Sequence, residues 1–334
     1  MEQWKRLGAF IGRHMAYFVP LCVVAGVLFP GVFGPLKAIV PLIFAVMTFQ
    51  GALNNTFEQL LAVFRHPLRL LVILAVAEVL MPCLAYLLGS LLFGDNVNLL
   101  TGVVLEYSVP IAVISFMWVG IYDGDGPLCL ASILVSTVIS PVSIPVTLSV
   151  LLGASIHIDA MSMVGDMVVM IALPALAGML VNELTRGWGH ERLSPALSPA
   201  SRLITIVLIT ANSTSMSEYV LNMTWQRLEV ALFILVFATS GFFWGLLAAR
   251  ILHGSQPLLA TMSFTCGLRN ISSGAVIAAQ YFPGETVFPV MCGTLFQQIL
   301  AATFGHIIER LCAEDTRERE RRASLARSIL RHRR

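Results

Sequence analysis

The chain has little charge. Of its 334 residues only 12% are Asp, Glu, Lys or Arg, about half of what an average globular protein carries. Residues 309–334 hold 14 of the 40 charged residues, which leaves 26 for the first 308. So few charges cannot cover a water-exposed surface, which excludes a soluble enzyme, a nucleic-acid-binding protein and a disordered chain. The apolar fraction of 57% and the mean hydropathy of +0.82 indicate an integral membrane protein.

Several sequence features with clear meanings are also missing. The six cysteines form no CxxC pair and most lie in apolar runs, so we expect neither a disulfide nor a metal site. Pro20 interrupts the first apolar run and no small-residue cleavage site follows, so the start is not a signal peptide. Motifs of intramembrane enzymes, such as GxSxG, HExxH or a paired GxGD, do not occur, so we expect no enzyme.

Long apolar runs predict an all-α integral membrane fold with about ten transmembrane helices, each needing about 20 apolar residues. The alternating pattern of a membrane β-barrel is missing. The predicted spans lie near 15–30, 35–53, 69–93, 97–121, 127–153, 160–182, 201–221, 228–252, 256–281 and 285–308.

The positions of lysine and arginine predict the orientation, because cytoplasmic loops carry an excess of both. Ten spans place both termini on one side, and that side then holds 18 of the 21 Lys and Arg residues. The other side keeps Lys37 and Arg227, and Arg269 falls inside a span. We therefore expect a multi-pass protein of the cell (inner) membrane with both termini cytoplasmic.

A polar connector at 183–200 divides the spans five and five. Because five is odd, two related halves would insert in opposite senses, as in many transporters with inverted repeats. The basic tail is either solvated or an amphipathic helix on anionic lipid. The predicted order is a cytoplasmic N-terminus (1–14), a first five-helix repeat (15–153), helix 6 at the start of the second repeat (154–182), the cytoplasmic connector (183–200), helices 7–10 (201–308) and a basic cytoplasmic tail (309–334).

Two of the predicted spans contain helix breakers, each in the fourth helix of its half. Pro110 lies in the middle of the fourth span, and Gly267, Asn270, Ser272 and Ser273 lie at the centre of the ninth. Backbone groups freed at membrane depth are tolerated only where they line a protein-buried or wet cavity. We therefore expect the substrate site where these two breaks meet.

Three segments resemble the bile acid/sodium symporter family. The most specific is CGLRNISSGAVIAA at 266–279, which is similar to the ninth-helix motif; the others are MTFQGALNNTFEQLLAVFRHP at 47–67 and EVLMPCLAYLLG at 78–89. The resemblance implies ten helices, a panel domain of spans 1, 2, 6 and 7, and a core domain of spans 3–5 and 8–10 in which the broken fourth and ninth helices cross. It also implies uptake of an organic anion driven by sodium.

The resemblance further marks where sodium would bind, and there this chain departs from the family. In the ninth helix the sodium-binding Glu falls on Thr265 and the Gln on Arg269, while Gly267 and Asn270 are retained. Sodium needs several hard oxygen ligands, and most side chains at these positions offer none, so we expect both sodium sites to be lost and no cofactor. The other equivalent positions are Ser115 and Phe116 in the fourth helix, Cys129 and Ile133 in the fifth, and Ala77 in the third.

Arg269 is the main candidate for function, because a charged residue inside a span by default faces a cavity. It could be a permanent substitute for sodium, bind a carboxylate or sulfonate of the substrate directly, or form a purely structural pair. Glu78 or Glu106 would supply the counter-charge, and either could carry a proton instead of sodium. Further candidate site residues are Asn270, Thr265, Gly267, Ser272, Ser273, Pro110, Ser115, Asn212 and Gln50.

Together these features predict a secondary active transporter that moves a small or amphipathic organic anion by alternating access. Its expected partners are the substrate and the lipid bilayer, with no nucleic acid and no obligate protein partner. The alternatives are a proton-coupled or uncoupled carrier in which Arg269 replaces sodium, and a membrane sensor that binds the substrate without transporting it.

Overall fold

The computed structural model describes residues 4, 6, 8, 10, 11, 14–58, 67–153 and 159–332. Over these ranges the chain is helical, apart from loops and one isolated pair of bridged residues. This confirms an integral membrane α fold. Seven helical runs are long and apolar enough to cross a membrane: Pro30–Ala52, Pro67–Phe93, Gly126–Leu152, Ala160–Leu184, Gly189–Leu221, Trp225–Ile251 and Gly284–Leu311. A shorter apolar helix, α2, spans Met15–Leu28.

The predicted fourth and ninth spans are each divided into two half-helices. The fourth consists of α8 (Val97–Ser108) and α9 (Ile114–Ile121), and the ninth of α16 (Gln256–Gly267) and α17 (Ile271–Tyr281). None of the four half-helices is long enough to cross a membrane alone. The breaks between them lie at 109–113 and at 268–270.

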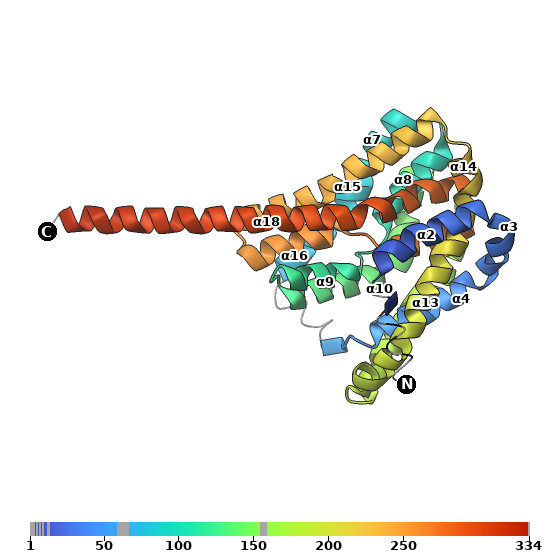
Figure 1. Cartoon of the computed structure of the whole chain (residues 1–334), viewed down its shortest axis with the longest axis horizontal. Helices are drawn as coiled ribbons and strands as arrows, with labels where there is room; N and C mark the ends of the chain where they lie inside the picture. The colour runs from blue at the N-terminus through green and yellow to red at the C-terminus, as the bar shows by residue number, and fades with distance from the viewer. Residues whose placement is uncertain are drawn as a thin grey trace.

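The helices pack in two groups. The first, which we call the panel, is formed by α2, α4 (Val40–Ala52), α12 (Leu173–Leu184) and α13 (Ser194–Ser213). Figure 1 shows α2, α4 and α13 gathered at one side of the molecule, with α7, α8 and α15 at another. The second group, which we call the core, contains α7 (Met81–Phe93), α8, α10 (Gly126–Leu152), α15 (Trp225–Ile251), α16, α17 and α18 (Gly284–His332).

Small residues let the core helices approach closely. Lipid gives transmembrane helices no hydrophobic reason to associate, so contact between backbones contributes more. At Gly245 of α15 a Cβ atom would collide with the Met262 carbonyl of α16. A side chain at this glycine would push α16 away from α15 and displace the helix that leads into the second break.

The third predicted span is not a regular helix. It begins as α6 (Pro67–Leu74), continues as the π-helical turn η3 (Ala75–Leu80) and ends as α7. Such π turns inside α-helices are rare and are frequent at functional sites. This one carries Ala77 and Glu78.

The last helix is much longer than a membrane span. α18 runs from Gly284 to His332 and projects far beyond the bundle towards the C-terminus (Figure 1). The helix continues without interruption across residue 309, where the sequence predicted the start of the tail.

Candidate functional site

The two helix breaks pair directly with one another. Ile111 of the first break and Arg269 of the second form an isolated antiparallel bridge. Backbone groups that the breaks release therefore satisfy each other, as buried amides at membrane depth require. Two hydrogen bonds flank the bridge, from the Asn270 N–H to the Pro110 carbonyl at 2.8 Å and from the Ala112 N–H to the Leu268 carbonyl at 3.1 Å.

The guanidinium of Arg269 lies at this crossing and only 3% of the residue is exposed. Its Nη2 donates to the Ala77 carbonyl at 2.7 Å, and its Nη1 donates a longer bond to the Val109 carbonyl at 3.5 Å. Val109 caps the C-terminus of α8, the negative end of that helix dipole. The cation thus lies against the carbonyl end of a half-helix and a π turn, where other transporters bind metal cations.

Both expected counter-charges lie near this cation without touching it. Glu78 and Glu106 interact electrostatically with Arg269, but no direct ion pair joins either to it within the described residues. Oε1 of Glu78 accepts a hydrogen bond from Ser136 at 2.5 Å. Glu106 is 2% exposed, and its Oε2 has no hydrogen-bond partner in the described part of the chain.

Gln297 of α18 holds the backbone of Arg269 and was not among the predicted site residues. Its Oε1 accepts from the Arg269 N–H at 3.2 Å, and its Nε2 donates to the Arg269 carbonyl at 3.0 Å. In the sequence, the feature that could have identified Gln297 was its polar amide inside the apolar run 285–308.

Ser136 of α10 was also missed. Its Oγ accepts from the Ile111 N–H at 2.9 Å and donates to Glu78, so it joins the first break to the π turn. Ser132 and Ser140 lie four residues away on either side, and all three are buried. A serine every four residues on one helix face was the signal in the sequence.

The predicted residues of the ninth helix have separate roles. Asn270 caps α17, with its Oδ1 accepting from the Ser273 N–H at 3.3 Å. At Gly267 a Cβ would collide with the Phe242 ring, so glycine allows this close packing. The Thr265 hydroxyl donates within its own helix, to the Thr261 carbonyl at 2.7 Å.

The positions that correspond to sodium ligands do not present a cation-binding set of side chains. Cys129 and Ile133 are buried in an apolar cluster, and Phe116 is 42% exposed. The Ser115 hydroxyl donates to the Phe264 carbonyl at 3.3 Å, joining α9 to α16. Arg269 already occupies the Ala77 and Val109 carbonyls. These residues do not fit a bound sodium ion.

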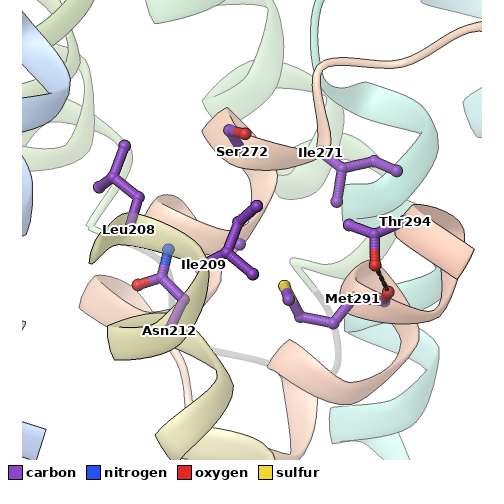
Figure 2. Close-up of a pocket in the computed structure, with 8 residues that line it drawn as sticks. Leu208, Ile209, Asn212, Ile271, Ser272, Met291 and Thr294 are labelled. Atoms are coloured by element: carbon purple, nitrogen blue, oxygen red, sulfur yellow. Dashed lines mark hydrogen bonds between the residues drawn. The ribbon is translucent and has the colours of Figure 1, made fainter. Parts of the chain in front are cut away.

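A small cavity lies between α13 of the panel and α17 and α18 of the core, and its empty space of about 220 Å³ includes open solvent. Figure 2 shows Ile209 and Asn212 facing Ser272 and Met291 across it. Oδ1 of Asn212 has no hydrogen-bond partner among the described residues. Ser272 lies in the first turn of α17, whose N-terminus is the positive end of its dipole. The lining residues are Leu208, Ile209, Asn212, Ile271, Ser272, Ala275, Met291 and Thr294.

Gln50 belongs to a different polar cluster. Its Nε2 donates to the Ser194 hydroxyl at 2.9 Å, and that hydroxyl donates to Asn54. Gln50 therefore links the end of α4 to the start of α13. Gln50 does not line the cavity.

Comparisons with known proteins agree on one family. The model of the sodium bile acid symporter family matches residues 41–223. Three relatives cover most of the chain. An uncharacterized protein of Bacillus subtilis, YbaS, is 36% identical over 296 residues, which cover 89% of this chain and 97% of the relative. An uncharacterized sodium-dependent transporter of the same bacterium, YocS, is 20% identical (86% and 88% covered), and the probable sodium/metabolite cotransporter BASS1 of Arabidopsis thaliana is 23% identical (90% and 75% covered).

Proposed function

The chain belongs to the sodium bile acid symporter family, and on that premise we propose that it carries a small or amphipathic organic anion across the membrane. The family resemblance is thereby confirmed, and the matched residues 41–223 include the resembling segments at 47–67 and 78–89. The chain is a multi-pass membrane transporter of this family and not an enzyme. The anion, the coupling and the topology below are our proposal.

In the proposed topology ten spans form two inverted five-helix repeats with both termini in the cytoplasm. The seven long helical runs, α2 and the two broken helices supply these spans. The core rocks against the panel, and the cavity between α13, α17 and α18 opens alternately to either side.

The cavity suits an anion better than a cation. The N-terminus of α17 offers its positive dipole end there, and Ser272 and Asn212 offer neutral hydrogen-bonding groups. The enclosed part of the cavity has room for little more than a water molecule, far less than a typical ligand pocket. A bulky amphipathic anion therefore requires the panel and core to separate further.

Arg269 is the resident cation of this carrier, and its geometry is the observation that carries the proposal. Its guanidinium donates hydrogen bonds to the Ala77 and Val109 carbonyls. The positive charge at the crossing therefore comes from the protein and does not require a bound sodium ion. Cys129 and Ile133 add no oxygen ligand. Anion binding should then be independent of sodium.

Thermal unfolding of the purified protein tests this. Pyruvate, pantoate, methanesulfonate and taurocholate are added in sodium buffer and in potassium buffer of equal ionic strength. A ligand at 100 times its dissociation constant stabilises the folded state by about 2.7 kcal/mol. We expect equal stabilisation in both salts. Stabilisation that appears only in sodium would contradict the resident-cation role.

The double variant Thr265→Glu/Arg269→Gln is the matched control, because it restores the two residues that the family resemblance assigns to sodium binding. It should gain a sodium-dependent rise in melting temperature that the wild type lacks. Flux of the same labelled anions into proteoliposomes distinguishes a carrier from a sensor, since a sensor binds without moving them.

A further inference from the structure

The crossing contains more negative than positive groups. Arg269 is the cation that acts on Glu78 and on Glu106 within the described residues. If both carboxylates are ionised, the buried site carries an uncompensated negative charge, which is strongly unfavourable away from water. One of the two carboxylates therefore needs another proton or cation.

The two carboxylates differ in their surroundings. Glu78 is partly exposed on the π turn, and its Oε1 receives the short hydrogen bond from Ser136. Glu106 is buried to 2% exposure, and its Oε2 has no donor anywhere in the described chain. The Ser136 hydroxyl stabilises a charge on Glu78, whereas among the described residues no donor reaches Oε2 of Glu106. Glu106 is therefore the carboxylate that needs the additional proton.

Glu106 lies just behind the cavity. A Cβ at Gly293 of α18 would collide with Oε1 of Glu106 and would touch the Ile271 side chain. Ile271 itself lines the cavity, as do Met291 and Thr294 on either side of Gly293. Because Gly293 has no side chain, it leaves room for Oε1 of Glu106 beside the cavity-lining Ile271.

Three titratable or charged groups act on this carboxylate or are acted on by it. Arg269 lies in the second break, Cys292 lies on α18, and Tyr107 is the next residue of α8. The Tyr107 hydroxyl donates to the Ile234 carbonyl at 3.3 Å, so it is directed towards α15. None of these groups donates a hydrogen bond to Glu106 among the described residues.

We propose that Glu106 binds the proton that this carrier transports together with its anion. An O–H bond of a hydronium ion in the cavity breaks as one forms at the Glu106 carboxylate, and a water molecule returns to the cavity; the reverse step occurs when the cavity opens to the other side. An anion in the cavity repels an ionised Glu106, so anion and proton each favour binding of the other. This proposal rests on the proposed function and names its coupling ion.

Infrared spectroscopy of the purified protein tests the proton site without any ligand. We expect a carbonyl band of a protonated carboxylic acid that is lost in Glu106→Gln and kept in Glu78→Gln and in the exposed control Glu218→Gln. Glutamine has the shape of the neutral acid, so Glu106→Gln should keep the wild-type melting temperature. If it does not fold, Glu106→Asp must retain the band. A band that persists in Glu106→Gln, or is missing from the wild type and Glu106→Asp, overturns the proposal.

Transport separates failure of this proposal from failure of the proposed function. Wild-type proteoliposomes receive labelled pyruvate, pantoate, methanesulfonate or taurocholate under an inside-alkaline gradient of one pH unit, which at equilibrium supports about tenfold accumulation for one proton per anion. Glu106→Gln should exchange the anion without accumulating it, and Glu218→Gln should match the wild type. Wild-type uptake that does not depend on the pH gradient would contradict proton coupling but would support the carrier function. A Glu106 infrared band without uptake of any probe would contradict the carrier function but would support the proton site.

Discussion

The two helix breaks pair with each other but contribute different chemistry. The first, Val109–Val113, has only apolar side chains and offers backbone carbonyls, of which Val109 and Pro110 accept hydrogen bonds from the second break. The second break carries the charge of Arg269 and the helix cap of Asn270. The backbones exchange hydrogen bonds in both directions, because the Ala112 N–H donates to the Leu268 carbonyl, but only the second break adds polar side chains. The crossing therefore depends most on the side chains of the second break, and single substitutions in and around both breaks test that asymmetry.

Arg269→Gln should have the largest effect. It leaves the Ala77 and Val109 carbonyls without their donor and two carboxylates without their cation. Removing one partner of a buried charged group typically costs about 3–5 kcal/mol. We expect the lowest melting temperature of the series and loss of anion-induced stabilisation in potassium buffer.

Arg227→Gln is the control for this loss of charge. Arg227 pairs with Glu285 at 3.2 Å in a partly exposed position, where an ion pair contributes about 0–1 kcal/mol. If Arg227→Gln and Arg269→Gln lowered the melting temperature equally, the guanidinium at the crossing would have no special role.

Gln297→Leu should rank second. It leaves the buried Arg269 N–H without its acceptor, at about 1–3 kcal/mol, whereas the Arg269 carbonyl keeps the Ile271 N–H at 2.9 Å as a donor. Differential scanning fluorimetry should show a clear fall in melting temperature. The adjacent Gln298 is exposed and bonds to Trp118 at 3.1 Å, so Gln298→Leu should change the free energy of unfolding by about 0.5 kcal/mol or less.

Ser136→Ala tests how α10 supports the first break. It removes the acceptor of the Ile111 N–H and the donor to Glu78, and we expect a loss of about 1–3 kcal/mol. Ser132→Ala is the matched control, because the Ser132 hydroxyl donates within its own helix, to the Leu128 carbonyl at 2.8 Å. Equal melting temperatures of the two variants would show that the first break needs no support from α10.

Asn270→Ala should have the smallest effect, because only the cap of α17 is lost, at about 1 kcal/mol. Asn96 caps α8 in the same way, with its Oδ1 accepting from the Leu99 N–H at 3.2 Å. Both variants should lose similar stability in the absence of anion. Only Asn270→Ala should weaken stabilisation by taurocholate, since α17 lines the cavity and α8 does not.

Apolar run lengths were sufficient to predict the helical membrane fold, and Pro110 and the polar cluster at 267–273 located both breaks. Arg269 was identifiable because charge inside a span is rare. The sequence could not show that its partners are the carbonyls of Ala77 and Val109, since any residue supplies a carbonyl. Nor could it show the π turn at Ala75–Leu80, whose residues are ordinary helix formers. Gln50 was grouped with the site on its polarity alone, and the fold bonds it to Ser194 instead.

A cation that is part of the polypeptide has an electrical consequence. A sodium ion enters with the substrate and leaves on the other side, whereas Arg269 returns with the protein in every cycle. A monovalent anion carried alone would therefore move net negative charge, and uptake into a cell that is negative inside would cost about 2.3 kcal/mol per 100 mV. One proton on Glu106 would make each cycle electroneutral, so uptake would become insensitive to the membrane voltage and respond to the pH difference alone.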